Sequence, residues 1–497
     1  MKRLGLLFCL ITNVIMAQSD FMGSCRFGEG HDIESSTMLS KLLLKDSSGY
    51  YMIRNKKHGK KQSRIEHYSL DLEFTHSGKI KSKRIKHNNI LMLNGKMYQF
   101  FTRQEYGANA KNVNILCARL IDIESLKPLK DEIELLRSIG QYEGVYNSSP
   151  FEITISPNGS KVLVHTKYTK VHGVPYKMDL HAFSDELDLL FTKEMDFKYT
   201  GNDWFIHNLL IDDLGNTYLV YQNGTTSTLI PKKADAYLWT YELSKQEENT
   251  QLLDKGSFAG LRVMPYKGIG ICIFGVGLEY RGVVLHTVKK ESKDLVSREI
   301  ILDLPEIWSS LFAPQRNLQR AEKIDYNARF NVIFNDKDEL QLVMEELTIH
   351  VDYHNSHSGF SKTVTYSYGD IHIIKANLDG NILWARQIAR IGITRSKNYC
   401  PYFSYSCVIT ETGISILYND NSKNEDKVNL DKLNRFTMSS RPMYVKVDVD
   451  ENGLMTRETI TMDRRSLKLF DISSDLGFFE EGFLLLKGSS KELLFRL

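Results

Sequence analysis

Four side chains of types that bind metals lie within eight residues of each other: His350, Asp352, His354 and His357. Imidazole nitrogens and carboxylate oxygens are ligands of zinc and other divalent metals. A loop that turns back on itself would bring all four around one ion, whereas an extended strand would place residues 350, 352 and 354 on one face. The sequence therefore indicates either a divalent-metal site or an exposed polar segment, and it indicates no other cofactor.

A second pattern imitates the start of a calcium-binding loop. Asp448, Asp450 and Asn452 place oxygen atoms at positions one, three and five, and Gly453 follows at position six. Position twelve should be a bidentate glutamate but is Thr459. Because Asn-Gly is also a strong hairpin-turn signal, we favour a turn here.

Motifs for covalent catalysis are absent from the sequence. It contains no Gly-x-Ser-x-Gly motif and no cysteine in a recognisable catalytic setting. A carboxylate pair for glycoside hydrolysis would have to come from different parts of the chain, and Asp179 and Asp203 are typical candidates that are equally well explained as blade-edge residues. We therefore predict no catalytic residue.

The cysteine count argues against a disulfide framework. Cys9 lies in an expected leader sequence, so five of the six cysteines remain, and five cannot all pair. Cys400 and Cys407 would form a disulfide if the segment between them doubles back. In an extended strand their Cα atoms would be about 23 Å apart, which is too far for a disulfide.

Export is expected from the N-terminus. Lys2 and Arg3 precede an apolar run that ends at Met16-Ala17, and this pattern is typical of a secretory signal peptide spanning residues 1–17. A lipoprotein alternative rests on Cys25, which stands well beyond the apolar run. No later stretch is apolar enough to span a membrane, so we expect a periplasmic, cell-surface or secreted chain.

Composition and charge exclude several classes of protein. With 42% hydrophobic and 25% charged residues, the chain can bury a large core and is not disordered. A net charge of +3 from 64 basic and 61 acidic residues does not favour nucleic-acid binding. A basic run at residues 55–64 is most simply a solvated loop, with a phosphate-bearing polysaccharide or a membrane surface as the alternative ligand.

Short β-strand signals recur along the chain, and these strands would have to position any functional site. Runs of β-forming residues follow glycine or asparagine turns at intervals of about 46 to 75 residues, and a second set of hairpins interleaves with the first. The first turns are expected near Gly49, Gly95, Asn158-Gly159, 214–216, 267–268, 336–338, Gly413 and 481–482. The second set includes 74–78, 123–125, 183–186, 241–244, 288–294, 377–380 and 449–453.

Two hairpins per unit predict four-stranded antiparallel blades of an all-β propeller. We expect eight blades, with seven as the alternative, in one domain over residues 18–497. The N-terminal segment near Phe21–Phe27 is expected to complete the blade of the C-terminus. Insertions are predicted at about 302–328, 346–368 and 419–441. The last two occupy equivalent places in neighbouring blades, so they should lie at the same end.

The clearest unit, Gly369–Ile388, resembles the β-propeller repeat of bacterial secreted and surface proteins. Asp370 opens its alternating strand, Gly380 and Asn381 form the turn, and Leu383-Trp384 begins the last strand. The other units match only in rhythm. The resemblance implies a fold and an exported setting, but no single activity.

These observations favour a binding or scaffolding module for a protein or glycan partner. The alternative is a carbohydrate-active enzyme, such as a glycoside hydrolase or lyase, with carboxylates from several blades meeting at a central channel. Metal-dependent chemistry at the histidines is a third hypothesis. The sequence does not define the oligomeric state.

Overall fold

The fold is described from a computed structural model. The residues that it describes are 26–27, 31–32, 37–56, 62–81, 88–106, 112–139, 151–166, 175–200, 204–223, 235–255, 258–266, 270–277, 282–289, 296–302, 330–334, 339–356, 359–377, 381–395, 404–410, 413–425, 433–437, 439–440, 442–461, 471–472, 483–487 and 491–496. The expected signal peptide, the lipoprotein cysteine and nearly all of the 302–328 insertion lie outside these residues.

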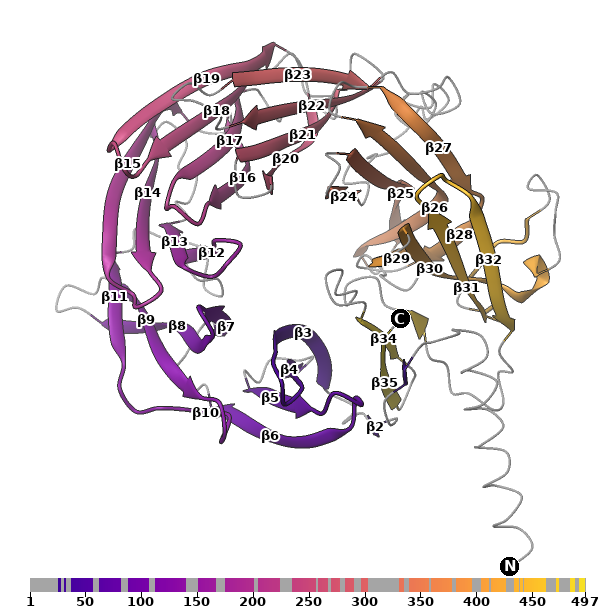
Figure 1. Cartoon of the computed structure of the whole chain (residues 1–497), viewed down its shortest axis with the longest axis horizontal. Helices are drawn as coiled ribbons and strands as arrows, with labels where there is room; N and C mark the ends of the chain where they lie inside the picture. Colours follow the sequence, from indigo (N-terminus) through magenta and orange to yellow (C-terminus); the bar gives the residue numbers. More distant parts are fainter. Residues whose placement is uncertain are drawn as a thin grey trace, which may run out of the picture. The chain divides into compact units, whose positions relative to one another are not determined.

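The chain has all-β propeller architecture with four-stranded antiparallel blades (Figure 1). In six sheets, four strands that are consecutive in the chain pair in order. The first three are β3–β6 (Thr37–Lys45, Tyr50–Lys56, Gln62–Tyr68, Phe74–Lys81), β12–β15 (Phe151–Ile155, Lys161–Thr166, Pro175–Ser184, Leu189–Thr200) and β16–β19 (Trp204–Ile211, Thr217–Asn223, Asp235–Glu242, Glu247–Lys255). The others are β20–β23 (Phe258–Tyr266, Gly270–Gly277, Gly282–Lys289, Val296–Leu302), β24–β27 (Phe330–Phe334, Glu339–Ser356, Gly359–Asn377, Ile382–Ile388) and β29–β32 (Tyr405–Thr410, Gly413–Asn421, Pro442–Asp450, Met455–Thr461).

Two further sheets are built differently. In one, both β10 and β11 pair with β9, in the set β7–β11 (Asn88–Leu93, Lys96–Tyr106, Asn112–Asp122, Lys127–Pro128, Ile133–Ile139). The other joins the two ends of the chain, with β1 and β2 (Arg26–Phe27, His31–Asp32) pairing with β35 of β33–β35 (Asp471–Ile472, Phe483–Lys487, Lys491–Arg496).

The predicted number of blades is wrong. The six regular blades replace the eight, or alternatively seven, equivalent blades that the hairpin rhythm indicated. The spacing of turns along the sequence gives the number of hairpins, but it does not show which strands pair within one sheet. The pairing of the chain ends was predicted correctly, because Arg26 lies opposite Arg496 and Phe27 opposite Phe495.

Most of the predicted turns lie between strands, but one is misplaced. Residues 74–78 were expected to turn and instead belong to strand β6. The chain turns earlier, where the Ser69 N–H donates to the Glu73 carbonyl oxygen at 2.8 Å and Leu72 adopts a φ of 66°. Leucine rarely takes this left-handed conformation, so Leu72 is not recognisable as a turn residue from its type.

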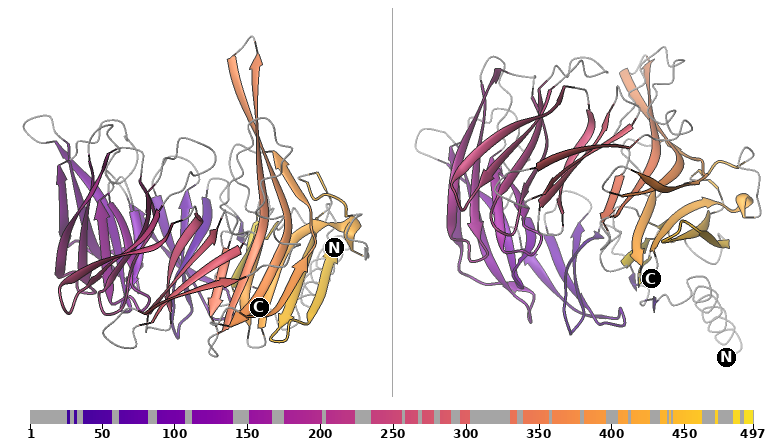
Figure 2. Two further views of the ribbon diagram at one scale, coloured as in Figure 1. Left: turned by 90° about the horizontal axis from the view of Figure 1, so that it is seen from above. Right: turned by 45° about the horizontal axis from the view of Figure 1, so that its top comes forward.

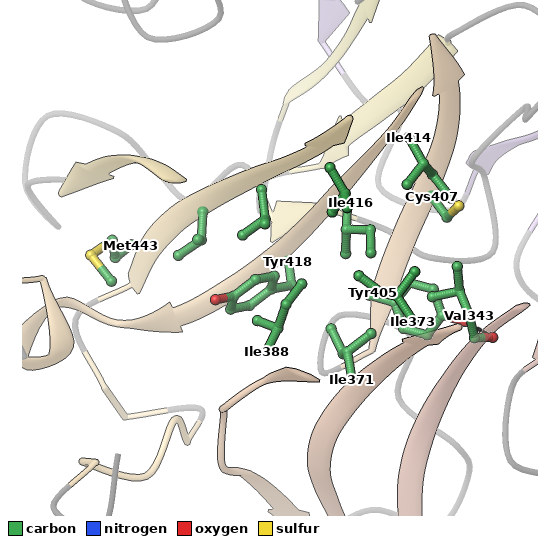
Figure 3. Packing of buried hydrophobic residues seen from close by; sticks show 13 residues of the cluster. Val343, Ile371, Ile373, Ile388, Tyr405, Cys407, Ile414, Ile416, Tyr418 and Met443 are labelled. Atoms are coloured by element: carbon green, nitrogen blue, oxygen red, sulfur yellow. Dashed lines mark hydrogen bonds between the residues drawn. The ribbon is translucent and has the colours of Figure 1, made fainter. Parts of the chain in front are cut away.

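Apolar side chains fill the spaces between neighbouring blades. One core lies between β24–β27 and β29–β32, where Ile373, Ile416 and Tyr405 are fully buried (Figure 3). A second lies between β12–β15 and β16–β19 and contains Leu163, Trp239 and other large residues. Alternate residues of each strand face these cores, which explains the alternating sequence pattern.

The chain divides into two compact units. One comprises residues 1–59, 65–76 and 315–497, and the other comprises 60–64 and 77–314. Within the part of the chain that the structure describes, no helix is long and apolar enough to cross a membrane.

Candidate functional site

The insertion at 346–368 is not the loop that the sequence suggested. It continues β25 and β26 as a two-stranded ribbon that projects past the end of their own blade (Figure 2). The pairing runs from Leu347 opposite Tyr368 to Ser356 opposite Gly359. Alternating β-forming residues on both sides of a short turn account for this hairpin. We call residues 347–356 and 359–368 the ribbon.

The ribbon changes the geometry of the predicted metal site. His350, Asp352 and His354 all lie in β25, whereas His357 lies outside the described residues. Residues two apart on a strand share a face and are about 6.7 Å apart. The strand therefore brings these three residues together in a row, where a metal would bind between two neighbours rather than inside a wrapped loop. Among the residues with described side chains, no cluster of three metal-ligand groups is found, so the site stays a prediction.

The register gives the ribbon two chemically different faces. Residues directly opposite each other in antiparallel strands share a face. Ile349 is opposite Tyr366 and Val351 is opposite Val364, which gives one row of apolar positions. On the other face, Asp352 is opposite Thr363. At the base of the ribbon, Tyr366 and Val364 are buried while Thr363 is half-buried.

A short strand braces the base of the ribbon. Strand β28 (Gly392–Arg395) pairs with residues 365–368 of β26. Phe436, from the 419–441 insertion of the next blade, lies beside β28: the Ile393 N–H donates to the Phe436 carbonyl at 2.9 Å, and the Phe436 N–H donates to the Ile391 carbonyl at 2.7 Å. The two insertions are thus linked through β28 at one end of these blades. We call this the loop end.

Asparagine side chains hold the neck of the 419–441 insertion. Asn424 donates to the Asn434 carbonyl oxygen at 2.9 Å and accepts the Asn434 N–H at 2.7 Å. Asn421 donates to the Arg435 carbonyl oxygen at 2.8 Å. Asp420 is buried beneath them, where desolvation raises the pKa of its carboxyl group. These contacts fix both ends of the insertion against its own blade.

A buried ion pair lies under the base of the ribbon. The Arg390 guanidinium is 3.1 Å from a Glu345 carboxylate oxygen, and both side chains are 1% exposed. Ser404 donates a hydrogen bond to the second oxygen of Glu345. The Arg390 guanidinium also lies over the ring of Tyr418, 5.2 Å from its centroid. Glu345 stands at the register shift where β25 leaves the blade, so the pair anchors the ribbon at its root.

The remaining sequence predictions are only partly covered. Cys407 is buried in the core between the blades, but Cys400 lies outside the described residues, so the disulfide stays a prediction. Asp450 accepts hydrogen bonds from the N–H groups of Asn452 and Leu454, both at 2.8 Å. The calcium-like pattern is therefore a hairpin turn in this structure.

One histidine–carboxylate pair was not anticipated. His165 Nε2 is 2.8 Å from Glu152 Oε2 across strands β13 and β12. Burial lowers the pKa of His165 to about 4, so the imidazole is neutral and can donate its Nε2–H to Glu152. Its buried Nδ1 has no hydrogen-bond partner within the described part of the chain. The twelve residues between Glu152 and His165 carry no motif, and only the pairing of β12 with β13 brings the two side chains together.

A second unanticipated cluster lies at the turn before β4. Ser48 Oγ is 3.1 Å from His67 Nε2, and His67 Nδ1 is 2.6 Å from Thr75 Oγ1. Asp46 accepts the Ser48 hydroxyl at 2.6 Å and also the N–H groups of Ser48 and Gly49. Because these N–H groups are already engaged, they cannot stabilise an oxyanion. The cluster therefore holds the turn.

Comparisons with known proteins assign this chain neither a family nor an activity. No family model matches the sequence, and no curated protein matches it. Dipeptidyl peptidase 4 from Porphyromonas gingivalis is 10% identical over 86% of this chain, with a TM-score of 0.41, and this chain spans 53% of its length. The polysaccharide lyase Uly1 is 10% identical over 95% of this chain and 99% of its own, with a TM-score of 0.38. An endo-arabinase from Bacteroides thetaiotaomicron is 12% identical over 56% of this chain and 99% of its own, with a TM-score of 0.24. Such low identities and scores transfer no activity.

Proposed function

We propose that this chain is an exported, non-enzymatic binding or scaffolding module that engages a protein or glycan partner through its loop end. The observation that carries the proposal is the ribbon, which extends β25 and β26 past their blade and is supported by three separate features. These are the buried Glu345–Arg390 pair, strand β28 and the Phe436 contact.

Holding the ribbon in one conformation costs conformational entropy. We therefore take its support by three separate features as a sign that the ribbon has a function. Function in rigid β-scaffolds commonly lies in the extended connections at one end. The loop end offers both an apolar row and a polar row of residues, and the apolar row suits a protein or the faces of sugar rings. Export rests on the sequence pattern at residues 1–17.

A shortened ribbon tests this proposal. Val351 and Val364 are opposite each other in the hairpin. Replacing residues 352–363 by Asn-Gly would therefore connect them through a favoured two-residue turn. Strand β28 would keep its pairing partners. The unchanged and shortened chains would be compared on arrays of glycans and on the exported proteins of the source organism. We expect specific binding by the unchanged chain and its loss on shortening; equal binding would contradict the proposal.

A carbohydrate-active enzyme is the second candidate, and the His165–Glu152 pair favours it. A neutral imidazole whose N–H is held by a carboxylate has part of the arrangement of a general base. Its Nδ1, which is unpartnered among the described residues, is buried, so catalysis would require an opening that exposes this nitrogen to the substrate. The expected activity is cleavage of a polysaccharide that His165→Gln abolishes. Cleavage that persists in this variant would exclude the pair as its catalyst.

A further inference from the structure

The outer edge of β25 in the ribbon has no neighbouring strand in the part of the chain that the structure describes. Among the described residues, no strand pairs with this edge beyond Met344, where β24 begins its pairing. Natural proteins normally protect such an edge with lysine, proline or a bulge. Residues 347–356 contain no lysine, arginine or proline, and Asp352 is their one acidic residue.

The distal part of the ribbon also has few strands. Strand β28 supports residues 365–368, so the pairs from Val351–Val364 to Ser356–Gly359 have only two strands in the described structure. A two-stranded hairpin is at best marginally stable in water, and a third or fourth strand supplies the missing stability. A further strand along the open edge of β25 would therefore stabilise the distal part of the ribbon.

We infer that a second copy of this chain supplies that strand, by antiparallel pairing of the two β25 edges around a two-fold axis at Val351. The inference rests on the sequence of the edge. With Val351 opposite Val351 of the partner subunit, Ile349 faces Tyr353 of the partner subunit. On the other face, His350 is opposite Asp352 of the partner subunit.

The edge is therefore self-complementary over residues 349–353. There, apolar positions meet apolar positions and His350 meets Asp352 of the partner subunit, twice in the dimer because of the symmetry. Further out, His354 meets Thr348 of the partner subunit and Leu347 meets Asn355 of the partner subunit. An isologous two-fold interface requires this kind of match between a surface and itself. Shifting the register by one residue would place Val351 opposite Asp352 and mix the two faces, which disfavours the alternative pairing.

One face of the resulting four-stranded sheet would carry Ile349, Val351 and Tyr353 of each β25 strand. On β26, Tyr366 and Val364 are opposite the first two, and Lys362 is opposite Tyr353. Cross-strand pairs of aromatic and β-branched residues stabilise sheets, as do pairs of opposite charge. A strand of another protein would not carry the same residues in the reverse direction. The second copy of this chain is therefore the occupant of the open edge.

A charge swap tests this pairing. The chain would be examined by sedimentation velocity over a range of concentrations, with EDTA present so that no metal bridges the copies. We expect a species of twice the chain mass. Asp352→Lys should raise the dimer dissociation constant by about tenfold, and adding His350→Glu should restore it by recreating opposite charges.

A matched control places the same charge on the same face of the ribbon but away from the edge. Ser361→Lys, on β26 opposite His354 rather than Asp352, should leave the dimer unchanged. A monomer at all concentrations, or a dimer that is insensitive to Asp352→Lys, would overturn the inference. The outcome is independent of the proposed function: a monomer that binds its partner would refute the dimer alone, and a dimer that binds nothing would refute the binding module alone.

Discussion

The indole nitrogen of Trp384 donates a hydrogen bond to the backbone carbonyl oxygen of Glu451, at 2.9 Å. Lys375 donates to the same oxygen at 3.1 Å, and Arg386 donates to the carbonyl oxygen of Gly453. Trp384 belongs to the clearest repeat copy, whereas Glu451 lies in a turn of the next blade. The tryptophan of the repeat therefore fastens one blade to its neighbour.

Removing this hydrogen bond should weaken the blade contact. Trp384→Phe keeps an aromatic ring but loses the N–H donor, and we expect the free energy of unfolding to fall by about 1 kcal/mol. Urea denaturation measures the change. Leu383→Ala, at a neighbouring side chain that is 47% exposed, is the control and should have a smaller effect. Similar losses from both substitutions would show that the hydrogen bond does not contribute.

Breaking the ion pair at the root of the ribbon should be more costly. Arg390→Met leaves the Glu345 carboxylate buried without its cation, and we expect a loss of about 3–5 kcal/mol in the free energy of unfolding. Adding Glu345→Met removes the stranded charge and should recover a large part of this loss. Lys96→Ala, in the exposed Lys96–Glu186 pair, should leave the urea midpoint nearly unchanged. A double variant as unstable as the single one would contradict a charge-based cause.

His165 should make stability depend on pH. Its pKa is about 4 in the folded chain against the ordinary histidine value of 6.5, so between these pH values the unfolded chain binds a proton that the folded chain does not. Stability therefore falls as the pH is lowered from about 6.5 to about 4, by about 3 kcal/mol in total. His165→Gln should flatten this part of a stability–pH profile, whereas His76→Gln, at an exposed site, should not. An unchanged profile in His165→Gln would exclude His165 as the origin.

The strand geometry of β25 narrows the predicted zinc ligands to two neighbouring residues of the row. Because one ion fits between two neighbouring residues of the row, Asp352 takes part in both possible pairs. Titration calorimetry with zinc should show weak binding that Asp352→Ala abolishes and His350→Ala only reduces. Asp448→Ala is a control outside the ribbon. Binding that survives Asp352→Ala, or no binding by the unchanged chain, would rule out this site.

The sequence was most informative where turn chemistry and alternation coincide. The strands that end at Asn377 and begin at Ile382 were predicted in the right places, because apolar residues alternate on both sides of a glycine. Leu72 shows the limit of this approach, because a leucine with positive φ carries no turn signal. The number of regular blades was not predictable either, because it depends on which strands share a sheet edge.

The candidate site was only partly predictable. The insertions and their common end followed from their equivalent places in neighbouring blades. Histidine and asparagine made residues 350–357 look like a loop, although the register with 359–368 makes most of them strand. Arg390 and Glu345 were missed because charged residues are normally exposed, and only the packing of two blades shows that they are buried together.

Site-specific photo-cross-linking tests the binding role of the loop end most directly. A photoreactive residue would replace either Arg395, exposed on β28 at the loop end, or Leu454, which is 67% exposed at a hairpin turn of the β29–β32 blade. The exported protein would be irradiated in its source organism and its adducts identified by mass spectrometry. We predict one reproducible protein or glycan adduct from position 395 and none from position 454. Equal labelling from both positions, or specific labelling from position 454 alone, would contradict the account.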